Sequence, residues 1–489
     1  MGKIIFRLLS LELNGIKNVE RGVLAFKESS KQAEETNPRF PLGEVMGIYG
    51  SNGSGKTAAI ESLYLLSALS RGFLLKRKRR LFASLPCCYA EQSKIVYRFY
   101  LSLPDGFRAT IDLTLCFAKA SADVRAIDLL SEKVAWKVME HGETFKGLRA
   151  KNLSLDYLSE EPSLSDDVLL RPAAIYGRLS EARMRKTAKL ISLKEQAKEQ
   201  GQFILLSDGF AEYLESLENE DARQSGAFIR LFANMLQTRL FVYTTEEDAL
   251  NVLGKGAAHA ITHDIPHGVY YSGRFAFHTD GPFDIPAEDR PHYNDLLEQI
   301  NCLVPSFIPG FKADIVSHGT RVVEGRLDES GEPKRVESIE IVRVLDQGVV
   351  PMSSESAGIR KFVSIASVLT EVYNDPSIIL AIDEFDSGVY EYLLGQIVMA
   401  LKESAQGQVL FTCHNLRPVE LLHGEGMFFT TVNPENRYLW FKGLKRNNNA
   451  RTSYFRALEL GGQKEPLYDE TFVSEIERAL RLGRKTPNA

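Results

Sequence analysis

The sequence predicts an α/β fold in which helices cover a largely parallel sheet. A short apolar run, GEVMGIYG (43–50), leads through a glycine-rich turn into a helix-forming stretch. Two later runs, SIILAIDEF (377–385) and GQVLFTCHN (407–415), are short, almost wholly apolar and end in polar residues. Runs of this kind are typical of parallel strands that are buried on both faces. We therefore expect buried strands at these three positions.

Other segments alternate apolar and polar residues, as strands buried on one face do. Two of them, at 95–103 and 108–117, are separated by the turn sequence PDGF and are predicted to form a hairpin. Hydrophobic periodicity also predicts further strands and one amphipathic helix, which lie at 3–13, 22–26 and 336–345 (strands) and at 356–373 (helix).

A chain of 489 residues exceeds the usual limit of a single hydrophobic core, so two lobes are expected. Hydrophobic residues make up 44% and charged residues 25%, and the formal net charge of -5 argues against a uniformly basic surface for nucleic acid. We divide the chain into a first lobe (1–120), a mixed, mostly helical insertion (121–310), the second part of the core (311–445) and a C-terminal helical extension (446–489).

The cysteines and the apolar runs indicate the cellular compartment in which the protein works. The five cysteines show no CxxC spacing, and two disulfides would leave one of them unpaired, so we expect free thiols in a reducing environment. Charges interrupt the N-terminal segment too early for a signal peptide, and no apolar run approaches the roughly 18 residues that span a bilayer. The expected location is the cytoplasm, with no membrane partner.

The turn after the first buried strand matches the phosphate-binding pattern GxxxxGK[ST] in full. Glycines let the backbone N–H groups face a phosphate, and the N-terminus of the following helix favours an anion. Lys56 is expected to bridge the β- and γ-phosphates, and Thr57 to join the shell of a Mg²⁺ ion. The alternative, a glycine-rich turn that only caps a helix, does not require Lys-Thr here. The predicted nucleotide-binding residues of this loop are Gly50, Ser51, Asn52, Gly53, Ser54, Gly55, Lys56, Thr57 and Ala58.

An acidic pair, Asp383 and Glu384, ends the buried run at 377–385. Carboxylates are costly at such a position unless they meet a metal ion or hydrogen-bond donors. Asp383 is predicted to orient Mg²⁺, and Glu384 to act as the general base that polarises the attacking water in phosphoryl transfer. The alternative is a strand that reaches the surface in two solvated acids, which is common for this dipeptide alone.

Three segments around this pair resemble nucleotide-contacting motifs of ABC-type ATPases. Upstream, SSESAGIRKF begins a helix, and Ser356 and Gly358 are the counterparts of the signature serine and glycine, with SAG in place of the usual SGG. Downstream, FDSG resembles the D-loop, with Asp386 as its aspartate. FTCHN resembles the switch segment, so His414 is expected to reach the γ-phosphate, with a structural histidine as the alternative.

The order of these motifs around a long insertion is similar to that in ABC-type ATPases that are not transporters, including the SMC, RecF and overcoming-lysogenization-defect families. The resemblance covers roughly residues 1–120 and 310–445 and implies a two-lobed ABC-type P-loop NTPase head. Two protomers would face each other with ATP between them. Gln92 is a candidate for the metal-sensing glutamine of such heads, with an ordinary surface residue as the alternative, and Tyr390 stands where a histidine is frequent and receives no role.

Other constellations are weaker. The basic stretch KRKRR (76–80) suits nucleic acid or an acidic partner, with a solvated turn as the alternative. A charged helix at 181–200 suits a partner or simply solvent. His259, His263 and His267 have a spacing that can hold a metal, but Pro266 breaks the helix that would align them. No nuclease motif is evident.

The main hypothesis is therefore a switch protein that binds and hydrolyses ATP with Mg²⁺, self-associates through its nucleotide sites and controls a separate effector, such as a nuclease. The resemblance places stand-alone relatives in prokaryotic anti-phage defence, of which the phage anti-restriction-induced (PARIS) system is one example. A RecF-like DNA-binding repair ATPase is the alternative, with KRKRR as its contact. A third hypothesis, a scaffold that binds ATP without turnover, is disfavoured by intact Lys56, Asp383 and Glu384.

Overall fold

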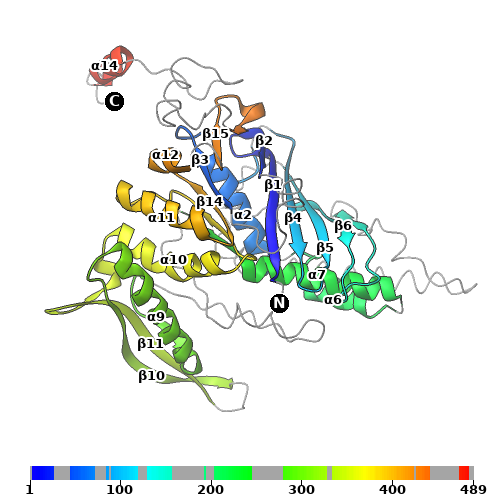
Figure 1. Cartoon of the computed structure of the whole chain (residues 1–489), viewed down its shortest axis with the longest axis horizontal. Helices are drawn as coiled ribbons and strands as arrows, with labels where there is room; N and C mark the ends of the chain where they lie inside the picture. Colours follow the sequence, from blue (N-terminus) through cyan, green and yellow to red (C-terminus); the bar gives the residue numbers. More distant parts are fainter. Residues whose placement is uncertain are drawn as a thin grey trace, which may run out of the picture.

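A computed structural model describes most of the chain, and the strands that it describes form three sheets (Figure 1). The described residues are 3–26, 44–71, 84–87, 90–118, 129–156, 192–193, 203–217, 219–244, 279–327, 333–422, 426–440 and 473–483. An antiparallel sheet and a mostly parallel sheet lie side by side in the body of the molecule. A smaller antiparallel sheet projects from this body (Figure 1).

The first sheet is antiparallel, and its described strands have the order β2-β1-β4-β5-β6-β7. The strands are β1 (Ile5–Ile16), β2 (Val19–Ala25), β4 (Gln92–Ser102), β5 (Arg108–Ala118), β6 (Leu129–Glu140) and β7 (Lys151–Asp156). Alternate residues of β4 and β5 are buried, and the two strands pair from Gln92–Ala118 to Ser102–Arg108, which confirms the predicted hairpin. The sheet continues past residue 120, where the sequence analysis ends the first lobe.

The second sheet has the order β16-β15-β3-β14-β13-β8 among the described strands, and only β16 runs antiparallel to its neighbour. The strands are β3 (Glu44–Tyr49), β8 (Leu240–Tyr243), β13 (Ile379–Ile382), β14 (Gln408–Thr412), β15 (Met427–Thr430) and β16 (Tyr438–Trp440). Every residue of β13 and β14 is buried, as the apolar runs predict. Strand β8 comes from the range expected to be an insertion, so that range completes the core sheet.

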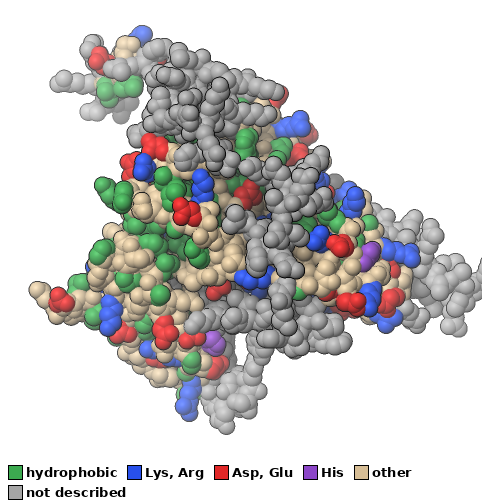
Figure 2. Space-filling model, viewed as in Figure 1, with side chains coloured by type: hydrophobic (Ala, Val, Ile, Leu, Met, Phe, Trp, Pro, Cys, Tyr) green, Lys and Arg blue, Asp and Glu red, His purple; other side chains and the backbone are tan. Residues whose placement is uncertain are grey.

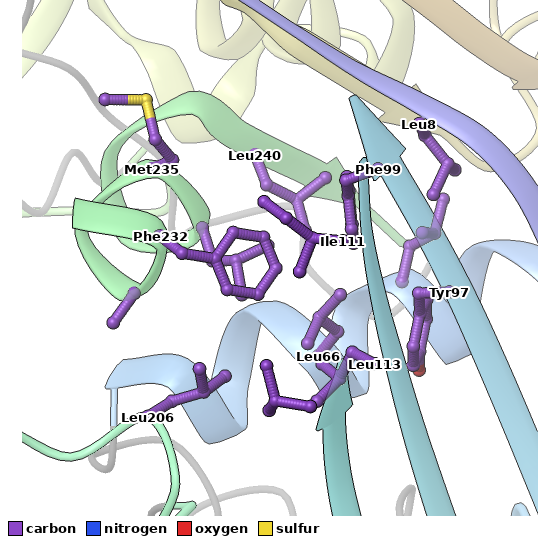
Figure 3. Packing of buried hydrophobic residues seen from close by; sticks show 14 of the residues in the cluster. Leu8, Leu66, Tyr97, Phe99, Ile111, Leu113, Leu206, Phe232, Met235 and Leu240 are labelled. Atoms are coloured by element: carbon purple, nitrogen blue, oxygen red, sulfur yellow. The ribbon is translucent and has the colours of Figure 1, made fainter. Parts of the chain in front are cut away.

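Helices cover both faces of the parallel sheet. One face packs through α2 (Lys56–Arg71) and α7 (Glu220–Arg239), with the short α6 (Asp208–Glu215) beside them, against the antiparallel sheet. Figure 3 shows Leu66 of α2 and Phe232 of α7 pointing into this layer beside Phe99 and Ile111. The other face is covered by α10 (Ala357–Asn374), α11 (Glu391–Ser404) and α12 (Arg417–Leu422).

The third sheet has its own apolar core. It contains β9 (Phe283–Pro286), β10 (Ala313–Leu327), β11 (Pro333–Leu345) and β12 (Gly348–Pro351), and α9 (Arg290–Phe307) packs on it. Short 3-10 turns occur at Ala287–Asp289, Met352–Ser354 and Pro434–Asn436. Helix α14 (Val473–Gly483) ends the described chain within the expected C-terminal helical extension, away from the body (Figure 1).

Some predicted features fall outside the described residues: KRKRR at 76–80, the histidines at 259–267 and nearly all of the helix at 181–200. Within the described ranges, no helix is long and apolar enough to cross a membrane. The described cysteines Cys87, Cys116, Cys302 and Cys413 are free thiols. On the face of the molecule that Figure 2 shows, acidic and basic side chains of the described residues are interspersed.

Candidate nucleotide site

The phosphate-binding loop connects β3 to α2 at the edge where the parallel strands end. The ammonium group of Lys56 is folded back along this loop, and its Nζ donates hydrogen bonds to the carbonyl oxygens of Gly50 and Ser51, each at 2.8 Å. Burial lowers the pKa of Lys56, and Asp383 and Glu384 partly oppose this shift. A half-desolvated cation in a loop of backbone donors is suited to hold a polyphosphate.

Two glycines show why this loop requires residues without a Cβ atom. Gly50 has a φ of 153°, and a Cβ built on it would lie 1.6 Å from Thr430 Oγ1. Gly53 has a φ of 73° and open space around it, so its backbone conformation alone favours glycine. The loop shape therefore depends on both packing and backbone conformation.

Strands β15 and β16 support the loop from behind. Thr430 Oγ1 lies 2.6 Å from Ser54 Oγ, which in turn donates to the carbonyl of Ser51 at 2.6 Å. The hydroxyl of Tyr438 donates to the carbonyl of Gly55 at 2.6 Å. Sequence analysis missed Thr430 and Tyr438, because neither belongs to a nucleotide motif and both come from the far end of the chain.

Asp383 follows β13 and lies beside the first turn of α2. Its Oδ1 accepts a hydrogen bond from Thr412 Oγ1 at 2.5 Å and is 3.5 Å from Thr57 Oγ1. Its Oδ2 is buried and has no hydrogen-bond partner among the described residues. A buried carboxylate oxygen without a donor is costly, and a cation satisfies it. The hydroxyl of Thr57 and the carboxylate of Asp383 are oxygen ligands that Mg²⁺ prefers, so these residues fit the ion.

Glu384 has an unusual backbone conformation. Its φ is 45°, a region that non-glycine residues rarely adopt. Its N–H donates to Thr412 Oγ1 at 2.7 Å, and its carbonyl accepts a hydrogen bond from Lys361 Nζ. Strained residues held by their surroundings occur mainly at functional sites. The side chain of Glu384 itself is only partly buried.

The predicted D-loop contacts the predicted switch segment through the carboxylate of Asp386. Asp386 Oδ2 accepts hydrogen bonds from the N–H groups of His414 at 3.0 Å and Asn415 at 2.8 Å. The side chain of His414 is exposed at this edge of the sheet. Burial raises the pKa of the neighbouring Cys413 thiol well above its usual value. Asp386 therefore fixes the segment that presents His414.

The signature counterparts begin α10. Ser356 is the N-cap, and its Oγ accepts a hydrogen bond from the Ile359 N–H at 3.3 Å. Gly358 packs against the D-loop, because a Cβ on it would lie 1.9 Å from the Gly388 carbonyl oxygen. Ser356 and Ala357 are exposed. The helix N-terminus is thus open to a ligand from outside the chain.

The two weaker candidates lie in ordinary positions. Gln92 is the exposed first residue of β4 in the antiparallel sheet. Tyr390 precedes α11 as its N-cap, makes no capping hydrogen bond with its side chain and is 76% exposed.

Thr412 and Lys361, by contrast, contact the acidic pair directly, although sequence analysis missed them. The sequence did carry one signal that could have identified Thr412, namely a hydroxyl residue at the end of the apolar run that follows the acidic pair.

The loop, the acidic pair and the helices on both faces of the parallel sheet define a P-loop ATPase head of the ABC type. The chain belongs to the family described as "AAA domain, putative AbiEii toxin, Type IV TA system", whose model matches residues 45–419. The matched range contains both the phosphate-binding loop and the acidic pair.

Solved structures with a similar arrangement include SMC heads. The SMC head of Pyrococcus furiosus bound to a domain of ScpA is 12% identical, with a TM-score of 0.39 over 93% of this chain and 99% of that one. The SMC head of Thermotoga maritima is 13% identical, with a TM-score of 0.31 over 89% of this chain and 100% of that one. The recombination mediator RecF with ATP is 11% identical, with a TM-score of 0.32 over 84% and 94%. No curated protein matches the sequence.

Proposed function

We propose that the protein is a Mg²⁺-dependent ATPase whose protomers assemble through their nucleotide sites and control a separate effector in prokaryotic anti-phage defence. The observation that carries the ATPase part is the buried Oδ2 of Asp383, which lacks a partner among the described residues beside Thr57 and the phosphate-binding loop. A cation bound here would offset the cost of burying this unpaired oxygen.

Each residue of the site has a task in this proposal. Lys56 and the loop backbone hold the phosphates, while Thr57 and Asp383 hold Mg²⁺, which offsets phosphate charge when bound. Glu384 accepts a proton from the attacking water. His414 approaches the γ-phosphate from the end of β14, where Asp386 fixes its backbone.

Assembly is supported by the open start of α10. The N–H groups at a helix N-terminus attract anions, and Ser356 and Ala357 are exposed there. A γ-phosphate held by a second protomer is an anion that such a helix end can bind. Two protomers related by a two-fold axis would then form two equivalent composite sites.

The effector and the defence role rest on family and resemblance. The family description refers to a putative toxin of a type IV TA system. We infer by analogy that this chain uses ATP occupancy to hold or release a second protein, such as a nuclease.

The test uses Glu384→Gln, which removes the base and keeps the size of the side chain. ATP binding should persist, phosphate release should fall by roughly 10²–10⁴-fold, and the ATP-bound assembly should persist during sizing. Glu403→Gln, on exposed α11 surface, is the control and should behave as wild type.

Affinity capture of the Glu384→Gln protein from its native cells with ATP tests the partner. A stoichiometric protein partner supports effector control. Recovery of nucleic acid alone would favour a DNA-repair ATPase instead. Unchanged phosphate release in Glu384→Gln would refute the assigned chemistry, whatever is captured.

A further inference from the structure

Both backbone polar groups of Glu384, its N–H and its carbonyl oxygen, make hydrogen bonds to side chains. Its N–H is bound by the hydroxyl of Thr412, which also donates to Asp383. Its carbonyl oxygen is bound by the ammonium group of Lys361. A φ of 45° is unfavourable for glutamate, so it persists only where the surroundings over-determine it. These two contacts meet that requirement.

The two anchors come from different parts of the fold. Thr412 ends β14, the strand that pairs with β13 in the parallel sheet. Lys361 lies in the second turn of α10, the helix that Ser356 caps. The N-terminus of that helix also packs against the D-loop through Gly358 and Gly388.

We propose that Lys361 is a positioning residue that couples the start of α10 to the catalytic carboxylate of Glu384. A phosphate bound at Ser356 shifts α10, and the contact of Lys361 with the Glu384 carbonyl moves the Glu384 turn with that helix. Hydrolysis is then fast only when the start of α10 contacts the phosphate. This inference rests on the proposed ATPase function and adds a residue and a route to it.

The charge of the ammonium group strengthens this contact. A hydrogen bond from a cationic donor to a carbonyl is roughly twice as strong as a neutral one. The side chain of Lys361 is only partly buried.

The main test compares Lys361→Met with Lys361→Arg. Methionine keeps the length of the stem and removes the donor, so kcat should fall by about 10–100-fold while KM for ATP stays within about twofold. Arginine keeps a cationic donor and should restore at least part of kcat. A purely structural role predicts that kcat and thermal stability fall while KM for ATP rises, and that arginine gives no specific recovery.

A matched control is available on the next helix. Lys402 of α11 donates to the carbonyl of Leu421 at 2.9 Å and is also partly buried, but this contact lies away from the acidic pair. Lys402→Met should lower the melting temperature by about as much as Lys361→Met and leave kcat at the wild-type value. Equal losses of kcat in both variants would overturn the proposal.

A second readout does not depend on turnover. Hydrogen–deuterium exchange of the peptide that spans 383–390 should be faster in Lys361→Met than in wild type, while the peptide that spans 50–60 is unchanged. If wild type fails to hydrolyse ATP, the proposed function fails, yet this exchange difference still tests the anchor. Identical exchange at 383–390 in the two proteins would overturn the proposal.

Discussion

Thr412 shows how one hydroxyl sets the geometry of two acids. Its Oγ1 donates to Asp383 Oδ1 at 2.5 Å and accepts from the Glu384 N–H at 2.7 Å. A hydroxyl can do both at once because it carries one donor and two acceptor positions. The Asp383 carboxylate and the Glu384 backbone are therefore oriented by the same atom.

Thr412→Val keeps the shape of this side chain and removes the hydroxyl. We expect kcat to fall by about 10-fold or more, because a hydrogen bond to a charged group is worth roughly 1.5–3 kcal/mol. Steady-state ATP hydrolysis measures the effect. Thr412→Ser keeps the hydroxyl and should stay within a few-fold of wild type, whereas equal losses in both variants would contradict the role of the hydroxyl.

At the scale of elements, the start of α10 packs against the turn before α11. Gly358 and Gly388 bring two backbones into direct contact, with the Gly388 φ at 72°. Neither glycine can gain a side chain without moving backbone. The start of α10 and the turn before α11 are therefore in close backbone contact.

Gly358→Ala should destabilise the protein by about 1–3 kcal/mol, because its Cβ would lie 1.9 Å from the Gly388 oxygen and backbone has little freedom to retreat. Thermal or denaturant unfolding measures this change. Gly395→Ala in α11 is the control: its Cβ would meet side-chain atoms of Arg417 and Leu421 at 3.0 and 3.1 Å, which can shift. A smaller loss for Gly358→Ala than for Gly395→Ala would count against the contact.

At the scale of the whole molecule, a buried glutamine joins the two large sheets. Gln408, the first residue of β14, accepts from the Leu8 N–H at 2.9 Å and donates to the Leu8 carbonyl at 2.9 Å. The side-chain amide thus pairs with β1 as a neighbouring strand would. This contact lies at the opposite end of β14 from Thr412 and fixes the lobes to each other.

Gln408→Leu should lower the free energy of unfolding by about 2–5 kcal/mol, because it removes the partner of a buried N–H and of a buried carbonyl. Chemical denaturation provides the measurement. Gln406→Leu loses only an exposed contact with Lys3 and should change stability by less than about 0.5 kcal/mol. If the two variants were equally stable, the sheets would not depend on Gln408.

Composite assembly predicts complementation between two defective proteins. Lys56→Ala should abolish nucleotide binding, and Ser356→Asp keeps the N-cap while placing negative charge against phosphate. In a two-fold assembly, a mixed dimer has one site with both residues intact, so an equal mixture should recover about a quarter of wild-type hydrolysis. A mixture as inactive as either variant alone would indicate that each site is complete within one chain.

The predicted strands and motifs agree with the structure where the signal is local. Alternating residues and the PDGF turn identified the β4–β5 hairpin, and continuous apolar runs identified the buried strands β13 and β14. The strands β6, β7 and β8 were not identified in the range expected to be mostly helical, because a short strand such as β8 continues directly from α7 and shows no period of its own.

The sequence by itself determined the chemical groups of the nucleotide site, because a phosphate-binding loop and an acidic strand end each require particular residue types within a few positions. Only the tertiary structure decided how those groups are held. Thr412, Lys361, Thr430 and Gln408 act through contacts between strands and helices that are distant in sequence. Such contacts follow from sheet order and helix packing, which local patterns do not encode.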